Sequence, residues 1–296
     1  MTYLKDLPIG AKIRENKSGT VFIVADHHHT GWKGTTVLSD KVCLISCIDA
    51  KEPSNPDEKI AAMGCNRYSL SNIHQWLNSA EENWYHPTHE FDAPPCDESI
   101  AMRQDVYQSD FFDQDSKFTP PFGYAGQPGY LARFDKAFQD SIIPNPIPCF
   151  GPNDPDIIHY GPPVAEDVIC KAFLPSAAEI GLEDEIRWEG YLIRLFLDPR
   201  MRMSDPENAA IHKEPDYVYK QSAVAFWVRS PLGGSSSMGK IYQVEHKFGD
   251  VVGATLMPHP VNYAAGIRPL LNLDDNIEIT GRDEYGVYSI KCGGEK

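Results

Sequence analysis

The most conspicuous polar cluster is Asp26-His27-His28-His29. Side chains two residues apart share one face of an extended chain, so His27 and His29 would lie on the same side. Imidazole and carboxylate groups bind transition metals, and further candidate ligands stand at His74, His86 and His89. A metal at residues 26–29 would support a metal-assisted enzyme. A histidine run at a strand end is also typical of a solvated loop. We prefer this interpretation and predict no metal site.

A second candidate is the pair Trp227 and Arg229, which alternation along a strand places on one face. A planar cation beside an indole ring suits a sugar ring or a carboxylate. The other interpretation, which we favour for the arginines, is that Arg229 and Arg268 are buried and structural. They would then pair with Glu179 or with backbone carbonyls and fix loops to a sheet.

Ligand contacts are predicted on or beside the C-terminal strands and loops, where aromatic and amide side chains follow one another. The predicted contact residues are Trp227, Tyr242, His246, Asn262 and Tyr263. Trp76 belongs instead to an apolar helical stripe and is predicted to lie in the core.

Other catalytic patterns find little support. Paired carboxylates occur at Glu81/Glu82, Asp113/Asp115 and Asp274/Asp275, but no pattern places two of them across a cleft. A His-x-x-Glu type zinc helix and a Gly-x-Ser-x-Gly elbow are absent from the sequence. The Gly- and Ser-rich segment 232–239 is typical of a linker, or of a loop that presents backbone groups to a ligand. We therefore predict no enzyme activity and no cofactor.

The seven cysteines form an odd set without a Cys-x-x-Cys pair. We expect them to be reduced and to behave as small hydrophobic residues. A disulfide framework or a zinc site is the other reading of the set.

The clearest helix signal covers residues 68–78. Ser69 or Ser71 can cap it, while Ile73, Trp76 and Leu77 form one apolar stripe. Short apolar runs between residues 11 and 48 predict a small antiparallel sheet, and five more runs after residue 223 predict further strands.

The middle of the chain is harder to assign. Residues 81–165 are predicted to be an irregular insertion rich in aromatic residues and proline, and residues 143–163 a long loop. The capping-box spacing of Ser176 and Glu179 predicts a helix over 177–182, with another near 185–197. Strands, a helix, an insertion, a helix and more strands make an α+β order within one elaborated domain, residues 1–296.

Composition excludes some partners. The chain has 296 residues, 42% of them hydrophobic, and a net charge of −15, the wrong sign for binding nucleic acid or an anionic membrane. No stretch approaches the length of a membrane span, and the N-terminal residues lack the pattern of a secretion signal. We therefore expect no nucleic acid or membrane partner, and synthesis in a cytoplasm.

Four boxes in fixed order carry a resemblance. They are residues 68–78 (YSLSNIHQWLN), 172–181 (AFLPSAAEIG), 226–231 (FWVRSP) and 266–273 (GIRPLLNL). In order and spacing they resemble a widespread domain of unknown function from Gram-positive bacteria and their phages. The last three are also similar to elements of the formylglycine-generating and C-type-lectin-like fold superfamily. This sequence departs from the pattern at Val228, a conservative change from leucine, and at Pro175, where leucine or serine is more usual.

The resemblance implies a C-type-lectin-like α+β fold: small, twisted, mostly antiparallel sheets, a few helices and long loops on one side. It also implies a non-enzymatic virion protein of a phage or prophage. We expect it to be a homo-oligomer that binds other virion proteins, or a host-surface glycan or protein, through the loop face. A metal-assisted enzyme and a component that only assembles remain as alternatives. The reactive cysteines of formylglycine chemistry and the calcium-binding motifs of lectins are absent from the sequence.

Overall fold

The computed structural model describes residues 1–51, 64–88, 92–101, 123–151, 164–182, 189–202, 226–231, 238–247 and 251–293. Strands dominate the described chain, which holds two α-helices and several short 3-10 helices. This confirms a sheet-dominated α+β fold.

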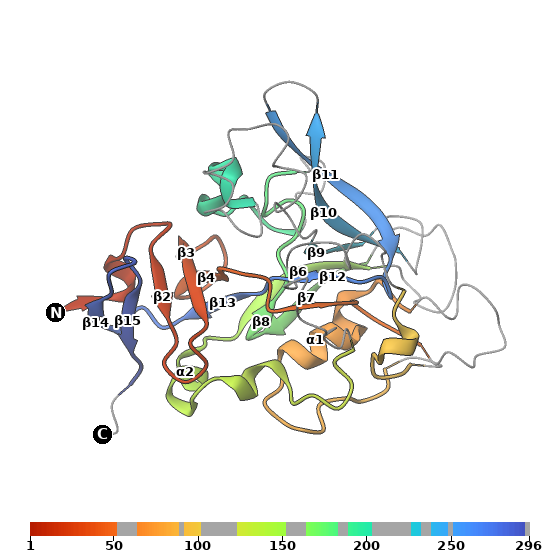
Figure 1. The fold of residues 1–296 in the computed structure, drawn as a ribbon, viewed down its shortest axis with the longest axis horizontal. Coiled ribbons are helices and arrows are strands. Elements are labelled where there is room, and N and C mark those ends of the chain that lie inside the picture. Colours follow the sequence, from red (N-terminus) through yellow and green to blue (C-terminus); the bar gives the residue numbers. More distant parts are fainter. Residues whose placement is uncertain are drawn as a thin grey trace, which may run out of the picture.

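An eight-stranded sheet joins the two ends of the chain (Figure 1). Its strands in spatial order are β1 (Thr2–Tyr3), β14 (Glu278–Arg282), β15 (Tyr288–Lys291), β2 (Lys12–Arg14), β3 (Val21–His27), β4 (Thr35–Ser39), β13 (Leu270–Leu273) and β8 (Ala172–Phe173). Neighbours are antiparallel except β15 and β2, which run parallel. The sheet is therefore mixed. Its strands β2, β3 and β4 pair antiparallel in chain order, as predicted for the N-terminal stretch, whereas the run predicted over 42–48 contributes a strand to the other sheet.

A second sheet has five strands, in the order β11 (Val251–Pro260), β10 (Met238–Lys247), β9 (Phe226–Pro231), β12 (Ala265–Ile267) and β5 (Leu44–Ser46). The parallel pair here is β12 with β9. Since β5 joins this sheet while β2, β3 and β4 join the larger one, the chain crosses between the two sheets after residue 39. Both sheets contribute to one buried apolar cluster.

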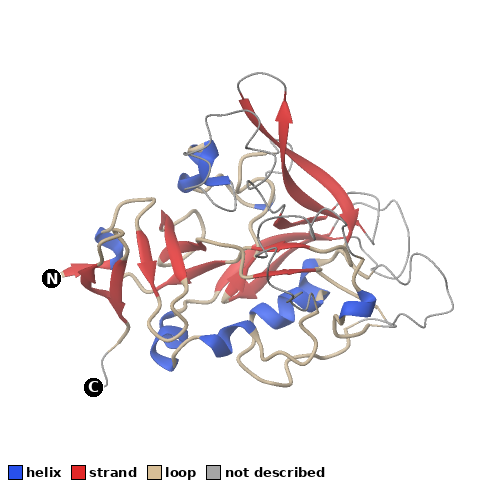
Figure 2. Ribbon diagram, viewed as in Figure 1, coloured by secondary structure: helices blue, strands red, loops and turns tan. Residues whose placement is uncertain are grey.

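The helices are short. They are α1 (Asn72–Leu77) and α2 (Lys136–Ser141), with 3-10 helices η1 (Leu4–Asp6), η3 (Tyr68–Leu70), η4 (Asp97–Ser99), η6 (Tyr130–Arg133), η8 (Arg194–Leu197) and η9 (Pro199–Arg202). Figure 2 shows α1 and α2 along the same side of the strands. Ser71 caps α1, since its hydroxyl accepts a hydrogen bond from the amide of His74, and the stripe of Ile73, Trp76 and Leu77 is buried.

The helix predicted over 177–182 does not form. The capping box is present: the Ser176 amide donates to Glu179 and the Glu179 amide donates to the Ser176 hydroxyl. The chain then closes a single turn, because Gly181 adopts a left-handed φ of 74° and the amide of Leu182 returns to the carbonyl of Ala177. The described part of 185–197 contains the 3-10 helix η8 and no α-helix, so the second predicted helix is also corrected.

The loop predicted over 143–163 contains a strand. β6 (Asn145–Gly151) pairs antiparallel with β7 (Val164–Cys170), and residues 152–163 lie outside the described residues. Pro146 and Pro148 are two residues apart, so both missing N–H groups belong to the same edge. A two-stranded sheet leaves one edge of each strand unpaired, which is why a strand with two prolines can form here.

Part of the predicted insertion belongs to the core. Tyr124, Tyr130, Phe134 and Phe138 are fully buried, and the rings of Phe134 and Phe138 lie 5.9 and 5.8 Å from that of Phe22 on β3. The aromatic residues of this stretch therefore form one layer with the larger sheet.

Candidate functional site

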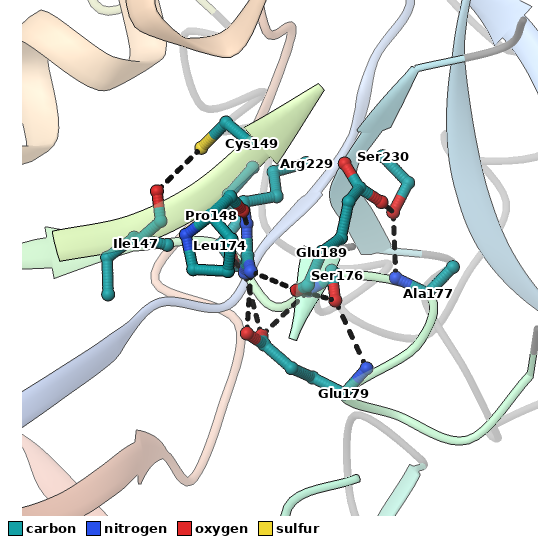
Figure 3. A network of polar contacts seen from close by, with 10 residues as sticks. All are labelled: Ile147, Pro148, Cys149, Leu174, Ser176, Ala177, Glu179, Glu189, Arg229 and Ser230. Atoms are coloured by element: carbon teal, nitrogen blue, oxygen red, sulfur yellow. Dashed lines mark hydrogen bonds and ion pairs between the residues drawn. The ribbon is translucent and has the colours of Figure 1, made fainter. Parts of the chain in front are cut away.

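Arg229 lies at the centre of a buried polar network (Figure 3). It stands on β9, all of whose residues are buried. Its two terminal nitrogens donate to the two carboxylate oxygens of Glu179 at 2.7 and 2.6 Å. The same nitrogens also donate to the carbonyls of Leu174 and Glu189, and Nε donates to the carbonyl of Pro148. The guanidinium therefore connects four segments that are remote in sequence.

The carboxylate of Glu179 stabilises the charged form of Arg229. Burial disfavours the charged guanidinium, but the carboxylate of Glu179 in direct contact outweighs it and raises the pKa of Arg229 above its ordinary value. The amide of Ala177 donates to the Ser230 hydroxyl, which in turn donates to the carboxylate of Glu189. These contacts hold the turn after β8 against β9.

Trp227 and Arg229 do not form the exposed binding surface that was predicted for them. Trp227 is 0% exposed, and its indole N–H donates to the carbonyl of Ser46 on β5 at 3.0 Å. We therefore remove Trp227 from the contact residues: its side chain fills the core of the smaller sheet, and the guanidinium beside it already has its partners within the protein.

Arg268 has the same kind of role. It is fully buried, it donates to the carbonyls of Ser39, Met201 and Asp40, and its guanidinium lies 5.8 Å from the ring of Phe226. Located between β12 and β13, it joins the two sheets to the end of η9.

The three histidines of the N-terminal cluster point to three different partners. His27 contacts the hydroxyl of Thr35 and the carbonyl of Leu7, and His28 contacts the carboxylate of Asp275 at 3.1 Å. His29 contacts Asp26 at 2.9 Å. β3 ends at His27, and His28 takes a left-handed φ of 49°, so the alternation expected of an extended chain stops there.

Asp26 makes the most contacts with other members of this cluster and with Arg194. Its buried carboxylate accepts hydrogen bonds from His29 and from the guanidinium and amide of Arg194 in η8. Burial raises the pKa of Asp26, yet the hydrogen bonds from His29 and Arg194 prevail and lower it to about 2. The cluster therefore binds η8 to β3.

No group of three metal-binding side chains converges within the part of the chain that the structure describes. His74, one of the further candidate ligands, has its Nδ1 beside the amide of Asn78 at 3.3 Å and the thiol of Cys170 at 3.8 Å. The seven cysteines are free. His89 lies outside the described residues.

The other predicted contact residues gather on one feature, which we call the arm: the hairpin of β10 and β11 with the turn that follows it, residues 238–247 and 251–263. Tyr242 and His246 stand on β10, opposite Leu256 and Val252. Asn262 and Tyr263 stand in the turn.

The base of the arm is anchored in the body of the molecule. The ring of Tyr263 stacks on that of His259 with centroids 4.4 Å apart, and Tyr263 forms a β-bridge with Ala101. The amide side chain of Asn262 donates to the carbonyl of Ser99. Asn262 and Tyr263 are both partly exposed, so aromatic and amide groups reach the surface at this point.

The outer part of the arm extends beyond its sheet (Figure 1). β10 pairs with β11 at ten positions, but β9 pairs with β10 only from Gly239 to Tyr242. β11 is an edge strand, and among the described residues its outer edge pairs with no other strand. The outer edge of β11 thus presents main-chain groups at alternate residues, with no N–H donor at Pro258 or Pro260.

Sequence reasoning missed Glu189, Arg194 and His259. Arg194 meets Asp26 across 168 residues, and no local spacing signals such a contact. The position of His259, four residues before Tyr263, gave no signal of ring stacking because the chain turns between them.

A family model described as "Domain of unknown function (DUF6273)" matches residues 33–275. The match contains the arm, the Arg229 network and three strands of the larger sheet, β4, β8 and β13. No curated protein and no solved structure matches this chain.

Proposed function

This chain belongs to the family described as a domain of unknown function, DUF6273, and for this member we propose a non-enzymatic role as a virion-associated protein of a phage or prophage. It binds a neighbouring copy of the same chain through the arm, and the repeated copies build part of the particle. The phage context and a C-type-lectin-like relation rest on the resemblance of the four sequence boxes.

The observation that carries the proposal is the outer edge of β11. A strand edge offers unpaired N–H and C=O groups in register, and a second strand can pair with them. An edge strand can pair antiparallel with the same strand of a second copy about a two-fold axis, which needs no other component. Since each main-chain hydrogen bond contributes roughly 0.5–1.5 kcal/mol net, several of them would stabilise such a contact.

A second argument is that a two-stranded ribbon is only marginally stable in water. The part of the arm beyond Tyr242 has no third strand among the described residues. A strand of a partner molecule would supply the third strand of this part of the arm.

The polar groups of the two candidate clusters are engaged within the protein. Arg229, Glu179 and Asp26 are occupied by contacts that fix loops to the sheets. The acidic charge of the chain disfavours nucleic acid and anionic membranes as partners, and no described helix is long and apolar enough to cross a bilayer.

The test uses proline within β11. Neighbouring residues of a strand direct their N–H groups to opposite edges, so one of Ala254 and Thr255 donates toward β10 and the other donates outward. Proline at the outward position removes only a donor that a partner would use. We expect that variant to dissociate the oligomer in light-scattering chromatography while its melting temperature is unchanged. The inward variant should instead lower the melting temperature.

Two outcomes contradict the proposal. The unmodified chain could be monomeric at every concentration, or both proline variants could remain as associated as the unmodified chain. In either case the arm does not join copies of this chain.

A host-surface ligand is tested separately, with labelled protein on intact Gram-positive cells. Tyr263→Ala removes a predicted contact at the base of the arm, and Tyr191→Ala is the matched control, since Tyr191 is 61% exposed on another element. Association without cell binding would favour a component that only assembles.

A further inference from the structure

A shallow groove lies between the start of β2 and the turn that joins β14 to β15. In Figure 1 these strands lie at the left of the molecule, away from β10 and β11. Its volume is about 400 Å³, within the range of ligand sites. The side chains that line it include Pro8, Ile9, Lys12, Arg282, Tyr285 and Tyr288. These residues lie outside the stretch 33–275 that matches the family model.

Arg282 is the charged group of the groove. Its guanidinium lies 5.0 Å from the ring centroid of Tyr288, and its Nε donates to the carbonyl of Gly286 at 3.1 Å. These two contacts orient the planar cation and leave its terminal nitrogens for a ligand. Among the described residues no carboxylate forms an ion pair with Arg282.

The acidic residue that follows Arg282 in the chain is already engaged. Asp283 pairs with Arg14 at 3.0 Å and accepts hydrogen bonds from the amides of Tyr285 and Val287. Lys12 adds a second cation to the lining, and it pairs with Asp40 at 3.3 Å. In a chain of net charge −15, the groove is thus a local place for an anion.

Tyrosine rings supply the apolar part of the surface. Tyr285 is 81% exposed at the turn, and Tyr288 is partly exposed beneath Arg282. The face of an aromatic ring is electron-rich and attracts the weakly positive C–H groups of a sugar ring, which stacks flat on it. Pro8 and Ile9 extend this apolar surface on the opposite wall.

We propose that the groove binds a pyranose ring that carries a negative charge, as a carboxylate or as a phosphate ester. The ring stacks on Tyr285, and the anionic group accepts hydrogen bonds from the terminal nitrogens of Arg282. The pairing of planar cation and aromatic ring that the sequence suggested for Trp227 and Arg229 thus occurs at the surface in a different place.

A peptide is the less favoured occupant. Extended peptides bind chiefly by adding a strand to an open sheet edge. At this groove β2 pairs with β15 and β3, and β15 pairs with β14 and β2, so both strands are paired on both sides. Ring contacts and the cation remain available, and these suit a charged saccharide.

The test is calorimetric titration of the full chain with four probes: a galacturonic acid trisaccharide, glucose 6-phosphate, neutral maltotriose and inorganic phosphate. We expect at least one charged saccharide to bind, and the neutral saccharide and free phosphate to bind about tenfold more weakly or not at all. Which charged saccharide binds distinguishes a carboxylate ligand from a phosphate ester.

Matched variants locate the site. Tyr285→Ala and Arg282→Gln should each weaken binding by about tenfold. Tyr191→Ala and Lys136→Gln remove an exposed tyrosine and an exposed cation elsewhere and should leave binding unchanged. Circular dichroism checks that all four variants are folded.

The proposal is overturned if neither charged saccharide binds at millimolar concentration, or if maltotriose or free phosphate binds as tightly as the charged saccharides. It is also overturned if Tyr285→Ala and Arg282→Gln bind as well as their controls. Since the groove and the arm share no residue, these results are independent of the oligomeric state.

Discussion

Among single residues, Glu179 is expected to have the largest effect on stability. Its carboxylate is fully buried and holds both terminal nitrogens of Arg229. Glu179→Gln keeps the shape but leaves the guanidinium buried beside a neutral amide, so we expect a loss of about 3 kcal/mol in the free energy of unfolding. Urea denaturation measures it. Glu82→Gln, at an exposed position, should change the value by less than about 0.5 kcal/mol. Equal effects of the two substitutions would contradict this account of the network.

The buried side chain of His74 is expected to make the free energy of unfolding depend on pH. Burial lowers its pKa from 6.5 to about 4, although Glu166 opposes the shift, and its ring also faces Cys170 and Tyr68. The unfolded chain therefore binds the proton more readily, so stability falls as pH decreases from about 6.5 to about 4. Over this range we expect a loss of about 1–3 kcal/mol, and His74→Gln should flatten the curve. If stability falls with decreasing pH as steeply in His74→Gln as in the unmodified protein, other groups cause the pH dependence.

Side-chain contacts could be predicted from sequence mainly where the two partners lie close together in the chain or their pairing has a chemical reason. Glu179 was predictable as a partner of Arg229, because a buried guanidinium needs a carboxylate or carbonyls to accept its N–H groups. The contact of Arg229 with the Glu189 carbonyl spans 40 residues and that of Arg194 with Asp26 spans 168, and neither has a local signal. The histidine row suggested a shared ligand because an extended chain was assumed, but the chain bends at His28.

At the scale of elements, Asp26 is predicted to keep η8 on β3. Asp26→Asn weakens the contacts with the Arg194 side chain and with His29, so the amides of residues 193–197 should exchange hydrogen faster. Hydrogen exchange followed by mass spectrometry measures this. Asp140→Asn, in an exposed pair with Lys136, is the control and should leave these amides unchanged. Unaltered exchange in Asp26→Asn would show that Asp26 does not keep η8 on β3.

The same cluster predicts that metal is not part of the fold. Because the partners of His27, His28 and His29 are a hydroxyl, a carbonyl and two carboxylates of the chain, dialysis against EDTA should leave the melting temperature unchanged. Elemental analysis of untagged protein should find no stoichiometric zinc or nickel. Stoichiometric metal that His29→Ala abolishes would restore the metal-assisted alternative.

Elements were predictable where periodicity is strong and contacts are local. The stripe of Ile73, Trp76 and Leu77 identified α1, and most C-terminal apolar runs became strands. The strand β6 was missed because proline is a poor strand residue in general, and only the pairing with β7 shows that one edge is unpaired. The turn at 177–182 was mistaken for a helix because a capping box marks a start and not a length.

At the scale of the whole molecule, the two sheets hold the arm and the groove apart (Figure 1). Their separation would let one surface join copies while the other binds a saccharide, and many copies on a particle would raise a weak affinity through multivalency. Sequence pointed to residues of the arm, such as Tyr242 and Tyr263, but not to its open edge or to the groove, since the edge of β11 and the groove both depend on the order of strands in space.

The central claim is that the outer edge of β11 pairs with a second copy, and hydrogen exchange of the β11 amides at several protein concentrations tests it most directly. The half of these amides that points to β10 should be protected at every concentration. The account predicts that the outward half becomes protected as concentration rises. Outward amides that exchange at the rate of unpaired groups at every concentration would contradict it.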